Sequence, residues 1–157
     1  MARSFVMALA AVATLALVVP AHAQDGGANV WLKSACANCH GNLADGDGDP
    51  AYPPGPSLRK TKLDADLLRE TISCGRPGTK MPFHLDGAYT KTSCYGVPVG
   101  AVPDQTAKGA QLTEQQIKTL VDFLVANVVG QARLNKKYCA AFNEGNQNAP
   151  ECLQYPQ

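Results

Sequence analysis

The sequence predicts an all-α domain in which short helices are separated by long loops. Three observations support this prediction: apolar residues recur at helical spacing in three segments, no segment alternates apolar and polar residues as a half-buried strand does, and Gly and Pro gather between the helical segments. Three modest helices make a thin core for the 134 residues (157 − 23) expected to remain once an N-terminal segment of 23 residues is removed. Small domains of this kind usually depend on disulfides or a buried cofactor.

The N-terminal segment has the pattern of a secretory signal peptide. Arg3 supplies a positive charge, an apolar run covers residues 5–19, and Ala21 and Ala23 form an Ala-x-Ala cleavage site. The pattern predicts export, with a bacterial periplasm as the compartment, where spare cysteines form disulfides. The apolar run is also just long enough for an uncleaved membrane anchor, but the small residues of the cleavage site favour the signal peptide.

The chain is expected to comprise a signal peptide, a helical domain and a C-terminal tail, at residues 1–23, 24–130 and 131–157. The first helix of the domain is short and runs into Cys36. The second follows Asp64, a suitable N-cap, and stops at Gly75.

The third helix has the clearest pattern. Thr113 and Gln116 form the capping box that starts a helix, and Gly130 suits the C′ position that ends one. Its apolar stripe consists of Ile117, Leu120, Val121, Leu124 and Val128.

Residues 36–40, Cys-Ala-Asn-Cys-His, match the attachment pattern of a c-type haem. Two thiols at this spacing add to the two vinyl groups of one haem, and His40 then falls beneath the iron as the proximal ligand. The sequence therefore predicts one covalent haem c, held by Cys36 and Cys39. Two other interpretations of the motif are less suitable. A thioredoxin-like redox pair would need a βαβ setting, which the sequence does not indicate. A zinc site would need two further ligands at similar spacing, but the other four cysteines are single and far apart.

Met81 is expected to be the second axial ligand. Methionine occurs at positions 1, 7 and 81, and the first two leave with the signal peptide. Met81 lies in a loop that Pro82 stiffens, and His84, three residues further on, is the competing ligand. A His/Met pair favours reduced iron and fills both axial positions, which indicates an electron-transfer protein rather than an enzyme with catalytic residues.

These residues resemble the class I cytochromes c, which are small monohaem electron carriers. The resemblance covers residue 27 to about residue 129 and rests on four motifs that occur in the order of the family. They are CANCHG, GPSL, GRPGTKMP and LVDFL, at residues 36–41, 55–58, 75–82 and 120–124.

The resemblance implies a cytochrome c-like fold, with three to five helices wrapped around one covalently bound haem. In this family the first and last helices cross, and Trp31 and Phe123 are the candidates for that contact. The resemblance also implies that the carbonyl of Pro56 accepts a hydrogen bond from Nδ1 of His40, which orients the ring. The axial methionine of the family corresponds to Met81.

The chain departs from the family pattern at Cys74, in a long insert from residue 83 to about residue 113, and in the tail. Four cysteines remain after haem attachment, and they allow three pairings. We favour Cys74–Cys94 and Cys139–Cys152, because nearby partners close first. The first bridge would enclose Met81; it would either hold the Met81 loop against the iron or only stabilise a loop-rich exported protein.

The predicted function is that of a periplasmic, monomeric electron carrier between a dehydrogenase and a downstream oxidase or cytochrome, and these partners rest on family analogy. The formal net charge of +1 gives no reason to expect nucleic acid, and no membrane span is expected after signal cleavage. Two alternatives stay open. One is a haem-bearing subunit of an alcohol- or sulfur-oxidising complex, which would dock through the insert and the tail. The other is a haem sensor or peroxidase in which Met81 dissociates.

Overall fold

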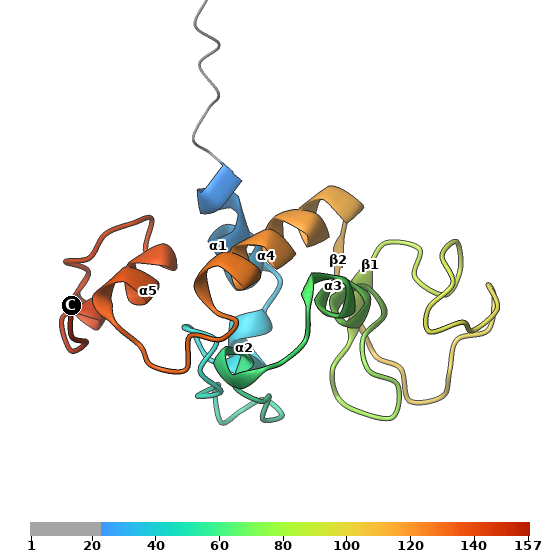
Figure 1. The fold of residues 1–157 in the computed structure, drawn as a ribbon. Coiled ribbons are helices and arrows are strands. Elements are labelled where there is room, and N and C mark those ends of the chain that lie inside the picture. Colours follow the sequence, from blue (N-terminus) through green and yellow to red (C-terminus); the bar gives the residue numbers. More distant parts are fainter. Residues whose placement is uncertain (1–22) are drawn as a thin grey trace, which may run out of the picture.

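The structure, a computed structural model, describes residues 23–157 (Figure 1). The predicted signal peptide lies outside the described residues, apart from its last residue. In chain order the elements are α1 (Ala23–Lys33), α2 (Cys36–His40), the 3₁₀ turn η1 (Leu58–Lys60), α3 (Ala65–Cys74), β1 (Phe83–Leu85), β2 (Lys108–Leu112), α4 (Glu114–Asn127), α5 (Lys136–Ala141) and the 3₁₀ turn η2 (Pro150–Cys152). None of the helices in the described part combines the length and apolar character needed to cross a membrane.

Helices α1 and α4 cross at the centre of the fold (Figure 1). Gly27 lies at the crossing, where an added Cβ atom would overlap Cβ of Phe123 and lie 3.0 Å from the carbonyl oxygen of Thr119. Only glycine therefore allows α1 to approach α4 this closely. The two helices and α3 contribute to one continuous apolar core.

Replacing Gly27 by alanine should lower the free energy of unfolding by about 1–3 kcal/mol, because the added methyl group has no space against α4. Chemical denaturation followed by circular dichroism measures this loss. Gly26→Ala is the matched control, since a Cβ atom at Gly26 meets only the Cγ2 methyl of Thr119, at 3.1 Å. Equal losses in the two variants would contradict the close crossing at Gly27.

The aromatic contact between the first and last helices differs from the prediction. Phe123 lies at the crossing as expected, beside Gly27, but its ring pairs with Phe142 of the tail and not with Trp31. Phe142 packs edge-on against both rings, with centroid distances of 6.1 Å to Trp31 and 4.9 Å to Phe123. The tail thus contributes a side chain to the core, which no helical pattern before residue 130 could indicate.

Helix α4 starts as its capping box predicts. Oγ1 of Thr113 accepts a hydrogen bond from the backbone N–H of Gln116 at 3.2 Å, and Oε1 of Gln116 accepts one from the backbone N–H of Thr113 at 2.9 Å. The helix ends slightly earlier than expected, because the C-cap is Val128. Gly130, which has a positive φ of 76°, therefore lies one residue beyond the C′ position predicted for it.

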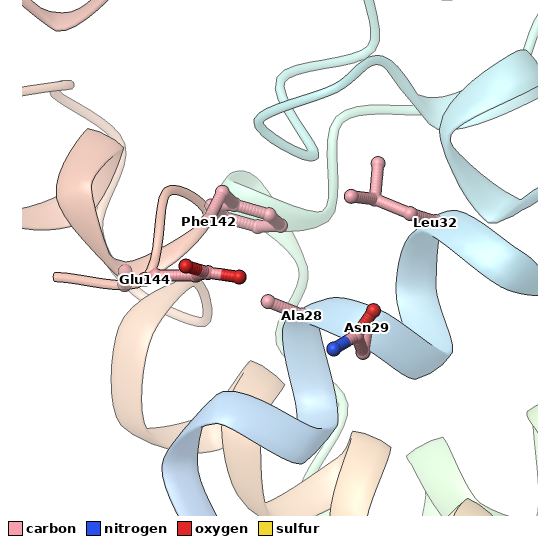
Figure 2. A pocket seen from close by; sticks show the side chains of 6 residues that line it. Ala28, Asn29, Leu32, Phe142 and Glu144 are labelled. Carbon is pink, nitrogen blue, oxygen red and sulfur yellow. The ribbon is translucent and has the colours of Figure 1, made fainter. Parts of the chain in front are cut away.

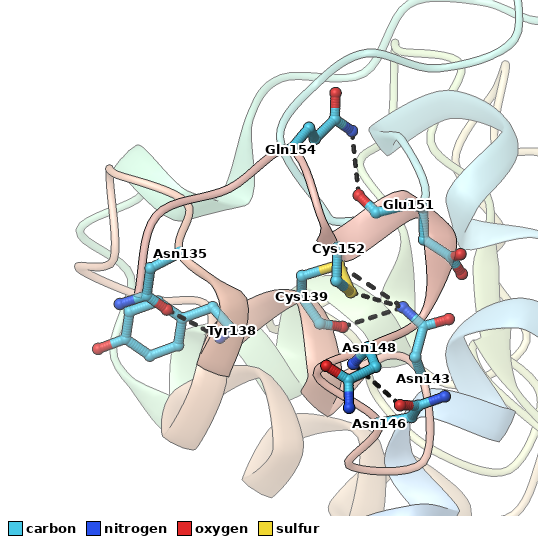
Figure 3. Close-up of a disulfide and its surroundings, with 9 residues drawn as sticks. All are labelled: Asn135, Tyr138, Cys139, Asn143, Asn146, Asn148, Glu151, Cys152 and Gln154. Carbon is cyan, nitrogen blue, oxygen red and sulfur yellow. Dashed lines mark hydrogen bonds between the residues drawn. A yellow bond between two sulfur atoms is a disulfide. The ribbon is translucent and has the colours of Figure 1, made fainter.

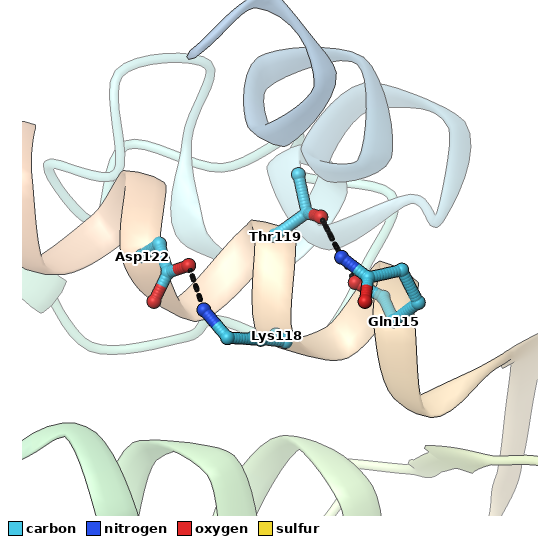
Figure 4. A network of polar contacts seen from close by, with 4 residues as sticks. All are labelled: Gln115, Lys118, Thr119 and Asp122. Atoms are coloured by element: carbon cyan, nitrogen blue, oxygen red, sulfur yellow. Dashed lines mark hydrogen bonds and ion pairs between the residues drawn. The ribbon is translucent and has the colours of Figure 1, made fainter. Parts of the chain in front are cut away.

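The solvent face of α4 carries polar pairs one turn apart (Figure 4). Nζ of Lys118 lies 2.6 Å from Oδ2 of Asp122, and Gln115 contacts Thr119. Both charged side chains are more than half exposed, so this ion pair contributes less than about 0.5 kcal/mol. Packing of the apolar face holds α4 in place, through Ile117, Leu120, Val121, Phe123 and Leu124.

A small sheet corrects the all-α prediction and the interpretation of the insert as loop alone. Strands β1 and β2 pair in parallel, with Phe83 beside Lys108 and Leu85 beside Leu112. Their register is irregular and β1 has only three residues, so the sequence shows no alternation long enough to indicate a strand. The pair brings the two ends of the insert together.

The tail is also more ordered than expected, because it forms α5 and η2. The side chain of Asn135 caps α5 by accepting a hydrogen bond from the backbone N–H of Tyr138 at 3.0 Å. A disulfide joins Cys139 to Cys152 and fastens η2 to α5 (Figure 3). In Figure 1 the tail lies on one side of the α1–α4 pair, and the insert extends from the other side.

The tail leaves a small hollow where it meets α1 (Figure 2). Its volume is about 50 Å³, which suffices for a few water molecules. The hollow is a packing gap rather than a ligand site. It is lined by Ala28, Asn29, Leu32, Ala141, Phe142 and Glu144.

Candidate haem site

A cavity of about 950 Å³ lies among the helices. Small-molecule and cofactor sites span roughly 300–1,000 Å³, so this volume suits a large cofactor. The apolar part of the wall comes from α1, α3, α4 and the segments beside them: Trp31, Leu63, Leu68, Ile72, Leu120 and Leu124.

The one-turn helix α2 brings Cys36, Cys39 and His40 to the cavity wall. The first helix does not run into Cys36 as predicted, because Ala35 is left-handed, with φ of 60°, and separates α1 from α2. Cys36 and Cys39 have free thiols, whereas the other four cysteines form disulfides. Burial raises the pKa of the Cys36 thiol to about 12. Among residues 23–157 no group of three or more His, Cys, Asp or Glu side chains gathers to hold a metal ion, which argues against a zinc site.

The imidazole of His40 is buried and held by a single hydrogen bond. Nδ1 lies 2.8 Å from the carbonyl oxygen of Pro56. A carbonyl can only accept, so Nδ1 carries the proton and Nε2 has a free lone pair. Burial lowers the pKa of His40, and the Pro56 contact opposes that shift. Gly55 leaves room for the ring, because a Cβ atom there would lie 2.7 Å from Nδ1.

The loop that contains Pro56 is fastened at several points. The backbone N–H of Gly55 donates to the carbonyl of Cys39, at 2.8 Å. Arg59 is almost fully buried, and its Nε donates to the carbonyl of Leu43 at 2.8 Å. Burial lowers the pKa of Arg59, and nearby Asp45 opposes this shift. These bonds fix the carbonyl that orients His40.

Met81 lies on the loop between α3 and β1 and also lines the cavity. The loop is closed by a hydrogen bond from the backbone N–H of Arg76 to the carbonyl of Met81, at 3.1 Å. At its base a disulfide joins Cys74 to Cys94, a pairing expected from the sequence. Tyr89 reaches the same point, since its hydroxyl donates to the carbonyl of Cys74 at 2.8 Å.

His84, which the sequence offered only as the competing ligand, lies at the cavity. A lone histidine in a loop-rich segment is usually a surface residue, but His84 is only 6% exposed and lines the cavity together with Met81. Its Nδ1 lies 2.9 Å from the carbonyl oxygen of Ala110 on β2. Burial lowers the pKa of His84, with the Ala110 contact opposing the shift. Only the strand pairing, which the sequence did not reveal, explains this position.

Residues 22–124 match the family model described as cytochrome c oxidase, cbb3-type, subunit III. The chain belongs to this family of c-type cytochrome domains. No curated protein and no solved structure matches it. As a c-type cytochrome domain, the protein binds haem c covalently and takes part in haem-based electron transfer with redox protein partners.

The residues of this cytochrome domain fit haem c. Two free thiols three positions apart face a large cavity with apolar walls, and an oriented imidazole directly follows the second thiol. A thioether from Met81 and a second imidazole from His84 line the same space. The cavity also carries three exposed basic side chains: Lys60, Arg76 and Lys80.

Proposed function

We propose that this protein is an exported electron carrier with one haem c, attached through Cys36 and Cys39 and ligated by His40 and Met81. The observation that carries the proposal is that one cavity brings these four side chains together. The bound haem supplies reversible one-electron chemistry. His40 and Met81 would hold the iron of the haem, and such a His/Met pair would raise its reduction potential.

The chain's own residues orient the ligands and exclude water. The carbonyl of Pro56 accepts the Nδ1 proton of His40 and so directs Nε2 away from the loop. The Cys74–Cys94 disulfide and the Arg76–Met81 backbone bond hold the loop that carries the thioether. The apolar walls exclude water, so that electron transfer requires little solvent rearrangement.

The partners in this proposal are a periplasmic dehydrogenase as donor and an oxidase or a further cytochrome as acceptor. The predicted signal peptide supports export, and family membership supports protein partners. Lys60, Arg76 and Lys80 support docking to acidic surfaces, because exposed charges beside a redox centre steer complementary partners.

An absorption spectrum combined with a redox titration tests the function. We expect a low-spin haem c with the weak absorption band of the Met–Fe bond in the ferric form, and a single one-electron transition. The pigment should stay with the polypeptide in acidic acetone. A colourless protein, or pigment that washes out, would disprove the proposal.

A second candidate is a haem-bearing subunit of a catalytic complex, such as an alcohol- or sulfur-oxidising enzyme. The description of the matching family, a subunit of an oxidase, favours a role inside an assembly. The insert and the tail, each fastened by a disulfide, would supply the contacts. Size exclusion of native extract separates the candidates, since a free carrier elutes as a small monomer and a subunit elutes with its complex.

A further inference from the structure

Two histidines that line the cavity are buried and hydrogen-bonded in the same way. His40 and His84 are 9% and 6% exposed, and both line the cavity. Each holds Nδ1 against a backbone carbonyl, at 2.8 Å from Pro56 and 2.9 Å from Ala110. Such a contact fixes the tautomer and orientation of an imidazole that ligates a metal.

The Ala110 contact determines which nitrogen of His84 is available. The carbonyl accepts, so Nδ1 must carry the proton of the neutral ring and Nε2 keeps its lone pair. Among residues 23–157 the Nδ1–Ala110 contact is the only hydrogen bond that the His84 ring makes, so Nε2 is not engaged by the protein. In this tautomer His84 cannot donate to an anionic group in the cavity, but its lone pair can bind a metal ion.

The backbone around His84 is built to hold this ring. Backbone hydrogen bonds of 2.9 Å on either side of it join Phe83 to Ala107 and Asp86 to Leu112. A Cβ atom at Gly109 would lie 2.6 Å from Cε1 of His84, so β2 accommodates the imidazole only because this residue is glycine. The ring is therefore pre-organised and does not depend on a flexible loop.

We propose that His84 is a reserve axial ligand, whose Nε2 binds the haem iron whenever the Met81 sulfur is not bound. The proposal rests on the proposed function, since it requires the haem and the Met81 ligand. Met81 and His84 are three residues apart and line the same cavity. When the Met81 sulfur leaves the haem iron, the imidazole of His84 is therefore still close to the iron. Replacing the thioether by an imidazole would lower the potential, because a methionine ligand raises it.

The test compares the haem-loaded Met81→Ala variant with the double variant Met81→Ala/His84→Ala. We expect ferric Met81→Ala to give mainly the low-spin electron paramagnetic resonance signal of two imidazoles, and the double variant to give a high-spin signal. Carbon monoxide should bind to the reduced single variant at least tenfold more slowly than to the double variant. A high-spin single variant with an equal rate would overturn the reserve role and leave the proposed function intact.

A second route does not require the Met81→Ala substitution. Hydrogen peroxide transfers one oxygen atom to a methionine sulfur and leaves water, and Met81 is the only methionine after position 7. Oxidised wild-type protein should change from the Met–Fe band to the two-imidazole signal, whereas oxidised His84→Ala should become high-spin. If the untreated wild-type protein already gives the two-imidazole resonance signal, His84 is a permanent ligand and the reserve role is overturned. A colourless wild type would instead disprove the proposed function.

Discussion

A chain with both Cys36 and Cys39 replaced by alanine should lose its folded helical structure, because no covalent bond then holds a cofactor in the central cavity. Without a cofactor, a space of about 950 Å³ among the helices leaves apolar side chains without packing partners, and unfilled space in a protein core costs about 24 cal/mol per Å³. Domains are stable by only roughly 5–15 kcal/mol, so even part of this cost unfolds the chain.

Far-ultraviolet circular dichroism of the haem-free variant measures the effect, and the visible spectrum reports any haem retained without covalent bonds. The matched control is Cys139→Ala/Cys152→Ala, which removes two cysteines of the tail bridge but leaves the cavity residues unchanged. The control should stay pigmented and helical. A cooperative thermal transition with native helicity in the haem-free Cys36/Cys39 variant would show that the cofactor does not support the fold.

Replacing both Cys74 and Cys94 with serine should lower the free energy of unfolding by about 3 kcal/mol. The disulfide joins residues 20 positions apart and so restricts the unfolded chain. The Met81 loop should be the first part of the protein to unfold in this variant. Cys74 and Gly75 at its base also accept hydrogen bonds from Tyr89 and Tyr95 of the insert, and the disulfide holds that segment in place. We therefore expect the Met–Fe band to disappear at lower denaturant concentration than the helical signal.

Cys139→Ser/Cys152→Ser supplies the comparison, because its bridge also closes a short loop, with a sequence separation of 13 against 20, but lies in the tail. That variant should also be less stable, but its Met–Fe band and helical signal should disappear together. If the two transitions also coincide in the Cys74→Ser/Cys94→Ser variant, the bridge only stabilises the protein as a whole and does not clamp Met81.

Local patterns with a direct physical meaning were readable from the sequence. Asp64 caps α3 by accepting a hydrogen bond from the backbone N–H of Leu67, and the capping box of α4 is formed by the expected pair. The Cys-x-x-Cys-His motif depends on covalent chemistry at fixed spacing, so it indicated the cofactor without any knowledge of the fold.

Features that arise from tertiary packing were not readable. Strands β1 and β2 are short and distant in sequence, so neither has a pattern of its own. The position of His84 follows from that pairing, and the place of Phe142 between two helices follows from how the tail folds back. In each case the deciding interaction joins segments far apart in the chain, which periodicity within one segment does not report.

The parallel pairing of β1 and β2 brings residues 85 and 112 side by side, although 26 residues separate them along the chain. A segment whose two ends already meet can be shortened, lengthened or exchanged at modest entropic cost. Those residues of the segment that neither anchor the Met81 loop, as Tyr89, Cys94 and Tyr95 do, nor contact His84 can therefore vary without altering the haem site.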